Sequence, residues 1–195
     1  DSSIGLLRTS FILGMVYYAV FAFLDYVILP DVSVHVMRIR FLIVIPTVFV
    51  ILLLSFTDGF QRWWQLGAGI ATVVSGAGIV AMTVLPHPLA RNHYYAGIIL
   101  ILIYCHLLIR LRFIWASLAG SIIVGLYVLS VLLYPGPGSD VSTVNLFFLA
   151  SANVLGMFGG YALEYYTRRD FYFRHLLREE HQRVEEANDK LEERV

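Results

Sequence analysis

Residues 159–171 read Gly-Gly-Tyr-Ala-Leu-Glu-Tyr-Tyr-Thr-Arg-Arg-Asp-Phe, and the composition of the chain changes abruptly across them. Residues 145–163 are nearly uncharged, whereas residues 168–195 carry 7 basic and 8 acidic side chains, 15 of the 28 in the whole chain. No proline interrupts the change, and no glycine follows Gly160, although a linker between independent parts normally contains loop residues. We therefore expect one helix to pass through this boundary without a break.

The composition of the chain predicts a membrane protein. Of its 195 residues 58% are hydrophobic, above the usual share in a soluble domain, and the mean hydropathy is +0.73. The formal net charge of zero says nothing about partners, but the distribution of the charges does not resemble the one-sided basic field of a nucleic-acid-binding protein. Cys105 is the single cysteine, so no intrachain disulfide can form, and we expect it to be a small buried hydrophobe. The chain begins at Asp1 and ends within a helical pattern, as expected of a piece of a longer protein without a signal peptide.

Six stretches are apolar enough to cross a bilayer, which takes roughly 20 residues of helix. They are residues 6–29, 39–56, 63–85, 94–109, 113–134 and 144–166. Proline, glycine and aspartate separate most of them, but the fourth break, at residues 110–112, is a charged corner without a turn residue. A large soluble helical core would need polar faces at helical spacing, and residues 41–54 have none. The sequence predicts an all-α bundle of six transmembrane helices.

The arginines between these stretches favour cytoplasmic positions for both termini. This orientation gives the inner side Arg8, Arg62, Arg110, Arg112, Arg168 and Arg169, and the outer side Arg38, Arg40 and Arg91. An even number of crossings agrees with two ends on the same side of the membrane.

The sixth stretch carries small residues at helical spacing, and small residues let two helices approach closely in lipid. Ala152, Gly156 and Gly160 form this row, and Asn153 beside it could donate or accept a hydrogen bond across an interface. Two interpretations remain open, namely packing within one subunit or a seam between two copies. A similar row of Gly67, Ala71 and Ser75 in the third stretch favours packing within the subunit.

The charged segment has the pattern of a signal-transmitting helix. Glu164 precedes Arg168 by four residues, the favourable order for a helical ion pair at the end of the apolar span. Leu177, Val184 and Leu191 recur every seven residues, which predicts the start of a coiled coil, although fewer than three heptads are present. A solvated amphipathic helix is the alternative. A short coil with polar residues at its other core positions suits switching between two packings.

Candidate ligand groups gather toward the predicted outer side. Asp25 is the one acid inside an apolar span, and such residues are functional candidates, although a hydrogen-bonded or snorkelling aspartate fits equally well. With Asp31, His35, His87, His93 and Asp140 it could hold a divalent metal or line the mouth of a small-molecule site.

Other kinds of chemistry find little support in the sequence. No phosphate loop, metal-spaced Cys/His motif or nucleophile with its base is present. A haem is a possible cofactor that the sequence leaves open, but it would need histidines paired across helices, because His93 and His106 are 13 residues apart, roughly 220° around one helix, and cannot jointly face one site. A transporter would show paired interrupted helices, and Pro46 has no counterpart in the other half.

Residues 90–180 resemble the six-crossing input domains that precede bacterial class III adenylate/guanylate cyclases. The resemblance lies in residues 145–157, in Tyr161, Glu164 and residues 168–171 after them, and in residues 95–97 and 111–116. Related modules precede diguanylate cyclases, and similar coils precede histidine kinases. The resemblance implies a parallel homodimer in the bacterial inner membrane that passes a ligand or lipid signal to cytoplasmic catalytic domains. The aspartates of such catalytic domains are absent here, so we expect no enzyme activity from this chain.

The sequence therefore predicts two parts, a six-helix sensory domain in residues 1–166 and a cytoplasmic signalling helix in residues 167–195. A small transporter or channel is the rival from another class, and a passive dimerising anchor is the second rival.

Overall fold

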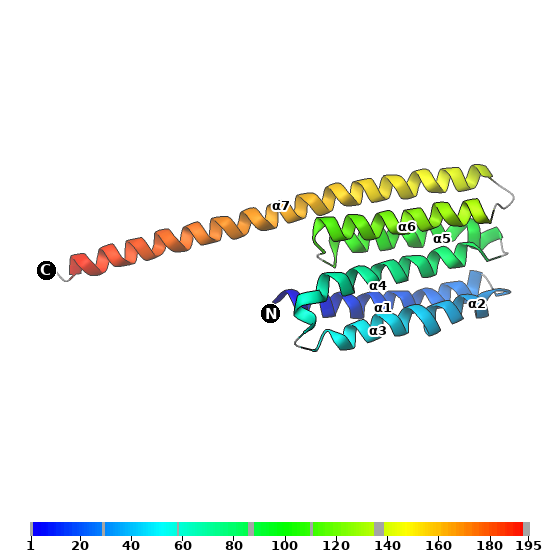
Figure 1. Cartoon of the computed structure of the whole chain (residues 1–195), viewed down its shortest axis with the longest axis horizontal. Helices are drawn as coiled ribbons and strands as arrows, with labels where there is room; N and C mark the ends of the chain where they lie inside the picture. Colours follow the sequence, from blue (N-terminus) through cyan, green and yellow to red (C-terminus); the bar gives the residue numbers. More distant parts are fainter. Residues whose placement is uncertain are drawn as a thin grey trace. The chain divides into compact units, whose positions relative to one another are not determined.

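The chain folds entirely into helices where the structure describes it (Figure 1). The computed structural model describes residues 2–28, 30–57, 59–85, 88–109, 111–134 and 139–192, without the side chains of residues 2–4, 61, 88–92, 139–140 and 186–192. The elements are α1 (Ser2–Ile28), α2 (Ser33–Arg38), the π-helix η1 (Ile39–Val44), α3 (Ile45–Leu54), α4 (Phe60–Thr83), α5 (Pro88–Leu107), α6 (Phe113–Leu133) and α7 (Ser139–Glu192).

Proline sets several of the helix boundaries. Pro30 follows the end of α1 at Ile28, and the residue before a proline disfavours helical backbone. Pro88 occupies the first position of α5, where its missing N–H is not needed. The break predicted at residues 110–112 is where the structure has it, since α5 ends at Leu107 and α6 begins directly after Arg112.

The second predicted span begins earlier than expected, because α2, η1 and α3 form one helical segment, Ser33–Leu54. Pro46 explains the π-helix within it, since proline cannot donate to the carbonyl of Leu42 and its ring crowds that carbonyl. The N–H of Ile45 instead reaches back to the carbonyl of Arg40, one residue further than in an α-helix.

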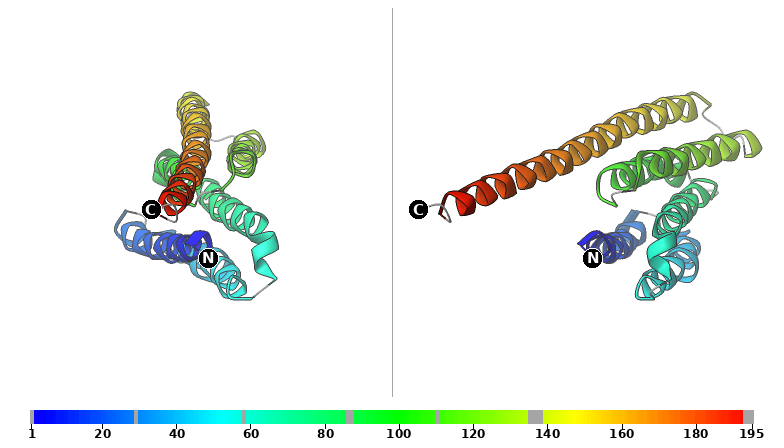
Figure 2. Two further views of the ribbon diagram at one scale, coloured as in Figure 1. Left: turned by 90° about the vertical axis from the view of Figure 1, so that its left-hand side faces the viewer. Right: turned by 60° about the vertical axis from the view of Figure 1, so that its left-hand side comes forward.

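Helix α4 is the central element of the bundle. It packs against α3, η1, α5 and α6, and the views in Figure 2 place it between the α1–α3 group and the α5–α6 group. Ala68 and Ala71 on α4 are almost fully buried, so small side chains allow its close approach to its neighbours. The row of Gly67, Ala71 and Ser75 therefore packs within the subunit, as predicted.

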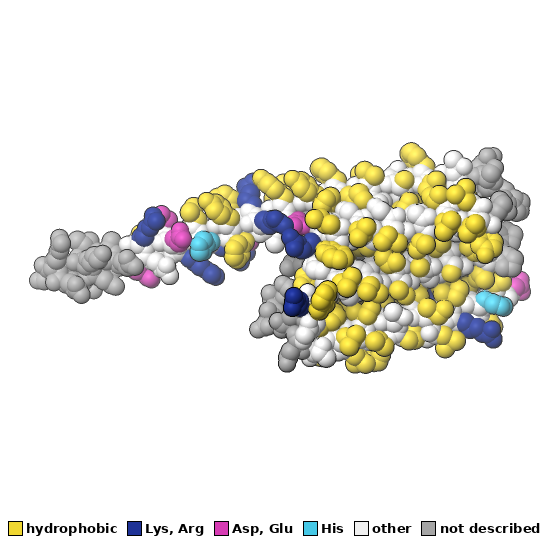
Figure 3. All heavy atoms as spheres, viewed as in Figure 1, with side chains coloured by type: hydrophobic (Ala, Val, Ile, Leu, Met, Phe, Trp, Pro, Cys, Tyr) yellow, Lys and Arg dark blue, Asp and Glu magenta, His cyan; other side chains and the backbone are white. Residues whose placement is uncertain are grey.

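The distribution of polarity is inverted relative to a soluble protein. Large apolar side chains cover the visible face of the helices in Figure 3, and Phe23, Leu42 and Ile114 are all more than two-thirds exposed. Asp25 and Arg40, by contrast, are buried. Such a surface suits contact with lipid, where an apolar exterior has no cost and a lone charge is expensive.

Five segments in the described part of the chain are long and apolar enough to cross a membrane. They are Gly5–Ile28, Ser33–Leu54, Arg62–Thr83, Phe113–Leu133 and Val141–Glu185. The fourth predicted span corresponds to a shorter apolar helix, His93–Leu107. The all-helical membrane class is thus confirmed, whereas the count of six crossings stays a prediction.

Helix α7 runs from Ser139 to Glu192 as one helix of 54 residues. The residues of the chain group into two compact units, Asp1–Gly160 and Tyr161–Val195, so the change of unit falls within this helix. The expected absence of a break across residues 159–171 is confirmed at the level of the backbone.

The contact between α4 and α6 gives a test of the packing. A methyl group on Gly76 would lie 2.6 Å from Ile123, which is fully buried, whereas a methyl on Gly125 would meet nothing within 4 Å. Gly76→Ala should therefore destabilise the bundle by about 1–3 kcal/mol. The matched control Gly125→Ala should be neutral or slightly stabilising. Thermal unfolding in detergent measures both, and equal midpoints for the two variants would contradict this packing.

Candidate functional site

A buried ion pair joins α1 to η1. Arg40 donates from Nε to Oδ2 of Asp25 at 2.7 Å, and the two residues are 2% and 4% exposed. The sequence analysis placed both Arg38 and Arg40 on the outer side of the membrane, but it did not foresee the burial of Arg40, whose side chain is buried while that of Arg38 is exposed. The hydrogen-bonded alternative for Asp25 is the one that the structure shows.

Two tyrosines extend this ion pair to further helices. The hydroxyl of Tyr94 on α5 donates to Oδ1 of Asp25 at 2.7 Å. Arg40 donates from Nη1 to the carbonyl of Tyr18 at 3.1 Å, and its guanidinium lies 4.7 Å from the centre of the Tyr18 ring. The Tyr18 hydroxyl in turn donates to the carbonyl of Ser75 on α4 at 3.2 Å. One polar network therefore connects α1, η1, α4 and α5.

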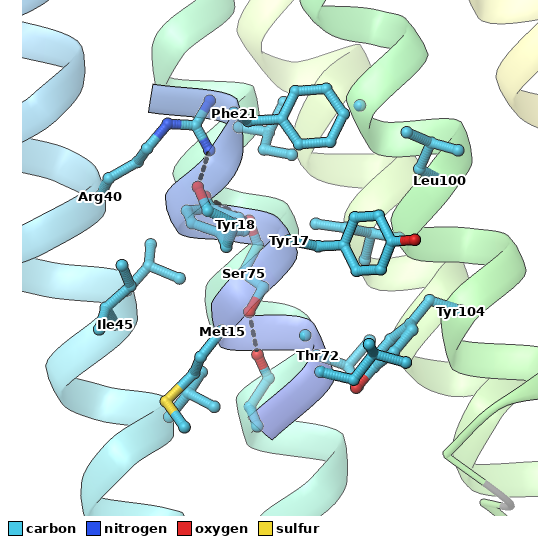
Figure 4. Close-up of a pocket in the computed structure, with 18 of the residues that line it drawn as sticks. Met15, Tyr17, Tyr18, Phe21, Arg40, Ile45, Thr72, Ser75, Leu100 and Tyr104 are labelled. Carbon is cyan, nitrogen blue, oxygen red and sulfur yellow. Dashed lines mark hydrogen bonds between the residues drawn. The ribbon is translucent and has the colours of Figure 1, made fainter. Parts of the chain in front are cut away.

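A cavity of about 670 Å³ lies beside this network within the first unit. Its lining is mostly apolar and comes from α1, η1, α3, α4 and α5, with the Asp25–Arg40 pair among the lining residues. Figure 4 shows Tyr17 and Phe21 of α1 directed toward Leu100 and Tyr104 of α5, with Arg40 on the other side of α1. This combination of apolar walls and a few polar groups is typical of small-molecule sites.

Tyrosine hydroxyls tie α1 to α5 at two levels. Tyr94 reaches Asp25, and Tyr104 donates to the carbonyl of Ser10, whose own hydroxyl donates to the carbonyl of Leu108 at 3.2 Å. Tyr94 and Tyr104 are 10 residues apart, about 15 Å along a helix. The cavity lining includes residues from both levels, so the walls of the cavity are fixed along this length.

The remaining predicted outer-side ligands have different surroundings. His93 lines the cavity together with Asp25, while Asp31 and His35 are exposed. His87 and the side chain of Asp140 lie outside the described residues. In the part of the chain that the structure describes, no three His, Cys, Asp or Glu side chains gather as a metal site, and a metal or haem site stays a prediction.

A second polar group lies where α5 meets α7. His106 is 3% exposed, and its Nδ1 lies 2.8 Å from the carbonyl of Leu102. Its Nε2 and the Oδ1 of the buried Asn153 have no hydrogen-bond partner among the described residues, and both side chains press against the position of Gly120 on α6. His93 lines the cavity and His106 does not, so the two histidines do not face one site, as their spacing predicted.

The small-residue row of α7 packs on His106. A methyl on Gly156 would lie 2.9 Å from Nδ1 of His106, and one on Gly160 would lie 3.5 Å from the same residue. Ala152 packs against the core cluster that contains the fully buried Leu149. The structure therefore shows this row in contact within one chain, and the seam between two copies stays a prediction.

The charged part of α7 has the expected local contacts. Arg168 pairs with Glu164 one turn earlier, and Arg174 pairs with Asp170 at 2.9 Å. Tyr165, Tyr166 and Phe171 beside them are exposed, as are Leu177 and Val184, while the side chain of Leu191 lies outside the described residues. The helix is present, and its coiled-coil pairing stays a prediction.

Comparison with known proteins assigns the chain to a family. The MASE8 family model matches residues 23–178, most of the chain. The chain belongs to the MASE8 family. MASE domains are membrane-associated sensory domains and are not themselves catalytic. No curated protein and no solved structure matches the chain.

The matched segment holds most of the groups described above. It includes Asp25, Arg40, Tyr94 and His106, and it continues along α7 to residue 178. The sequence analysis singled out Asp25 but missed its partner, although Arg40 lies inside an apolar stretch of its own. The spacing of Arg38 and Arg40 was the available signal, because residues two apart point to opposite sides of a helix.

The ion pair of this MASE8 bundle should be needed for stability. Asp25→Asn and Arg40→Met each leave one charge buried without its partner, and each should cost about 3–5 kcal/mol. The double variant Asp25→Asn/Arg40→Met removes both charges and should cost clearly less than the sum of the two single variants. Arg38→Met, at an exposed arginine on the same segment, is the control and should have little effect. Thermal unfolding of the purified chain measures the four variants, and additive losses in the double variant would argue against the pair.

The contact between α7 and His106 should be sensitive to one methyl group. Gly156→Ala places a carbon against the His106 ring and should cost about 1–3 kcal/mol. The control is Gly159→Ala, three residues along the same helix. Its added methyl group would lie 3.5 Å from Cδ2 of Leu107, an ordinary van der Waals distance. Hydrogen exchange of residues 145–160 should rise in the first variant and not in the second. Unchanged exchange in both would show that this packing does not hold α7.

Proposed function

We propose that this MASE8 domain is the input part of a dimeric bacterial nucleotide cyclase and passes its signal through α7. The observation that carries the proposal is the continuity of α7, which extends from Ser139 in the bundle to Glu192 in the charged segment. A sensory domain must act on something outside itself, and the residues that follow the apolar span continue in the same helix. The MASE8 match also spans the boundary, from residue 23 to residue 178.

The route from the bundle to α7 runs through α5 in this proposal. One face of α5 lines the cavity with Leu100, Ile101 and Tyr104, and His106 contacts Gly156 and Gly160 of α7. A shift or rotation of α5 would therefore act on both sites. A ligand can shift such an equilibrium only through different affinities for the two states.

We propose six crossings with both termini in the cytoplasm of a bacterial cell. The shorter helix His93–Leu107 would be the fourth crossing. The burial of Arg40 supports this orientation, because it removes one arginine from the outer side and leaves Arg38 and Arg91 there. The bias of arginines toward the inner side is then larger than the sequence alone indicated.

The cyclase output rests on the resemblance of residues 90–180 to cyclase input domains. A diguanylate cyclase or a histidine kinase is the alternative output, since a charged helix of this kind also precedes those enzymes. A parallel homodimer would let two copies of α7 pair through Leu177, Val184 and Leu191, as their heptad spacing predicts.

The two rival functions make different predictions. A transporter or channel would give flux in proteoliposomes and would gain nothing from the charged extension of α7. A passive anchor could be replaced by any dimerising membrane segment without a change in output.

Insertions in α7 test the proposed route. We expect fusion of the chain to a class III cyclase catalytic domain to give an output that depends on the phase of the helix. Two alanines inserted after Asp170 rotate the following residues by roughly 200° and should change basal cyclic-nucleotide synthesis several-fold. A seven-residue helical insertion returns the phase to within roughly 20° and should restore the original output.

A flexible insertion is the matched control for mechanical continuity. Four residues of Gly-Gly-Ser-Gly at the same place should uncouple the output, whereas four alanines keep the helix and change only its phase. Equal synthesis from every fusion, including one whose bundle is replaced by an unrelated dimerising segment, would support the passive anchor and contradict the proposal.

A further inference from the structure

The cavity beside the Asp25–Arg40 pair has the features of a binding site for a particular class of molecule. It is part of the first unit and is lined by described residues of α1, η1, α3, α4 and α5. Its volume of about 670 Å³ lies within the usual range for small-molecule sites. The class of its ligand depends on the polarity of the walls and on the net charge of the polar group.

The walls accept an apolar body. Val44, Val48 and Ile79 on one side and Leu100 and Ile101 on another present only carbon to the cavity. Tyr17 and Phe21, directed toward α5 in Figure 4, add aromatic surface. An elongated hydrocarbon or a flat ring system would fill such a space without leaving polar groups unsatisfied.

The polar group offers hydrogen bonds without a net charge. Asp25 and Arg40 carry opposite charges at 2.7 Å, so together they are neutral. Arg40 uses Nε for Asp25 and Nη1 for the carbonyl of Tyr18, and its side chain also interacts with the hydroxyl of Tyr94, but a guanidinium has five N–H donors, more than these three contacts need. A carbonyl or hydroxyl oxygen on a ligand could therefore accept from Arg40 while Asp25 stays paired.

An ionised ligand fits this site poorly. A carboxylate or an ammonium group would bring a charge that the neutral pair does not compensate, and an uncompensated charge is costly away from water. A purely hydrocarbon ligand would leave the spare donors of Arg40 unused.

We propose that the cavity binds an uncharged amphiphile, with an apolar body between α1 and α5 and a carbonyl or hydroxyl head at Arg40. The assignment rests on the proposed function in one respect, because it names the class of molecule that the sensory bundle detects. Binding itself requires only this chain.

Photolabelling in lipid nanodiscs tests the assignment with three probes that share one hydrocarbon chain and carry the same diazirine. The probes are dodecanol, which has a neutral head group, dodecane, which has none, and laurate, which has an ionised one. A hydrogen bond to a charged donor should favour dodecanol over dodecane by about tenfold in half-saturating concentration. Unlabelled dodecanol should compete, and the labelled peptides should come from α1 and α5.

Two variants locate the binding. Ala96→Trp fills the cavity from α5 and should abolish specific labelling, whereas Leu118→Trp, at an exposed position of α6 outside the cavity, should not. Asp25→Asn leaves the charge of Arg40 uncompensated and should reverse the preference from dodecanol to laurate. Thermal unfolding first establishes that each variant is folded. If Asp25→Asn is not folded, Ala96→Trp provides the test.

Three results would overturn the proposal. Equal, non-competed labelling by dodecanol and dodecane would show that ordinary lipid chains occupy the cavity. Preference of the unmodified chain for laurate would contradict the neutral head, and labelling unaffected by Ala96→Trp would place the binding elsewhere. None of these results depends on an output domain, so they leave the helical coupling through α7 to its own test.

Discussion

The arrangement of the bundle depends on the neutralisation of one buried charge by another. A lone charge is costly in an apolar interior, and Arg40 on η1 pairs with Asp25 on α1 at 2.7 Å. Because Tyr94 and the carbonyl of Tyr18 complete the network, the pair also fixes the positions of α5 and α1. The cavity lies beside this network and takes its polar character from it. The same few atoms therefore both connect the helices and line the cavity.

Two kinds of contact hold the helices, and they serve different purposes. Close contacts of small residues, such as Gly76 against Ile123 and Gly156 against His106, place backbones near one another over short distances. Polar contacts of tyrosine hydroxyls tie α1 to α5 while leaving space between them. The first kind packs α7 closely against α5, and the second connects α1 to α5 along the cavity that both helices line.

Much of the fold could be predicted from the sequence because hydropathy and helix-breaking residues act locally. The apolar stretches, the corner before Phe113 and the unbroken helix through residues 159–171 follow from composition along the chain. The site could not be predicted in the same way, because Arg40 and Asp25 are 15 residues apart and meet only after α1 and η1 pack. Pro46 was noticed, but its effect, a π-helix that includes Arg40, depends on how the backbone relaxes around the missing N–H.

The residues around the boundary in α7 limit the kinds of motion that this helix can carry. Tyr165, Tyr166 and Phe171 favour the interfacial layer of a bilayer, and Arg168 and Arg169 beside them favour its aqueous side. A displacement of α7 along the membrane normal would move the arginines into hydrocarbon in one direction. In the other direction it would move the aromatic rings into water. A turn about the helix axis moves none of these groups to a different depth. The flanking residues therefore oppose displacement of α7 along its axis, whereas they do not oppose its rotation about that axis.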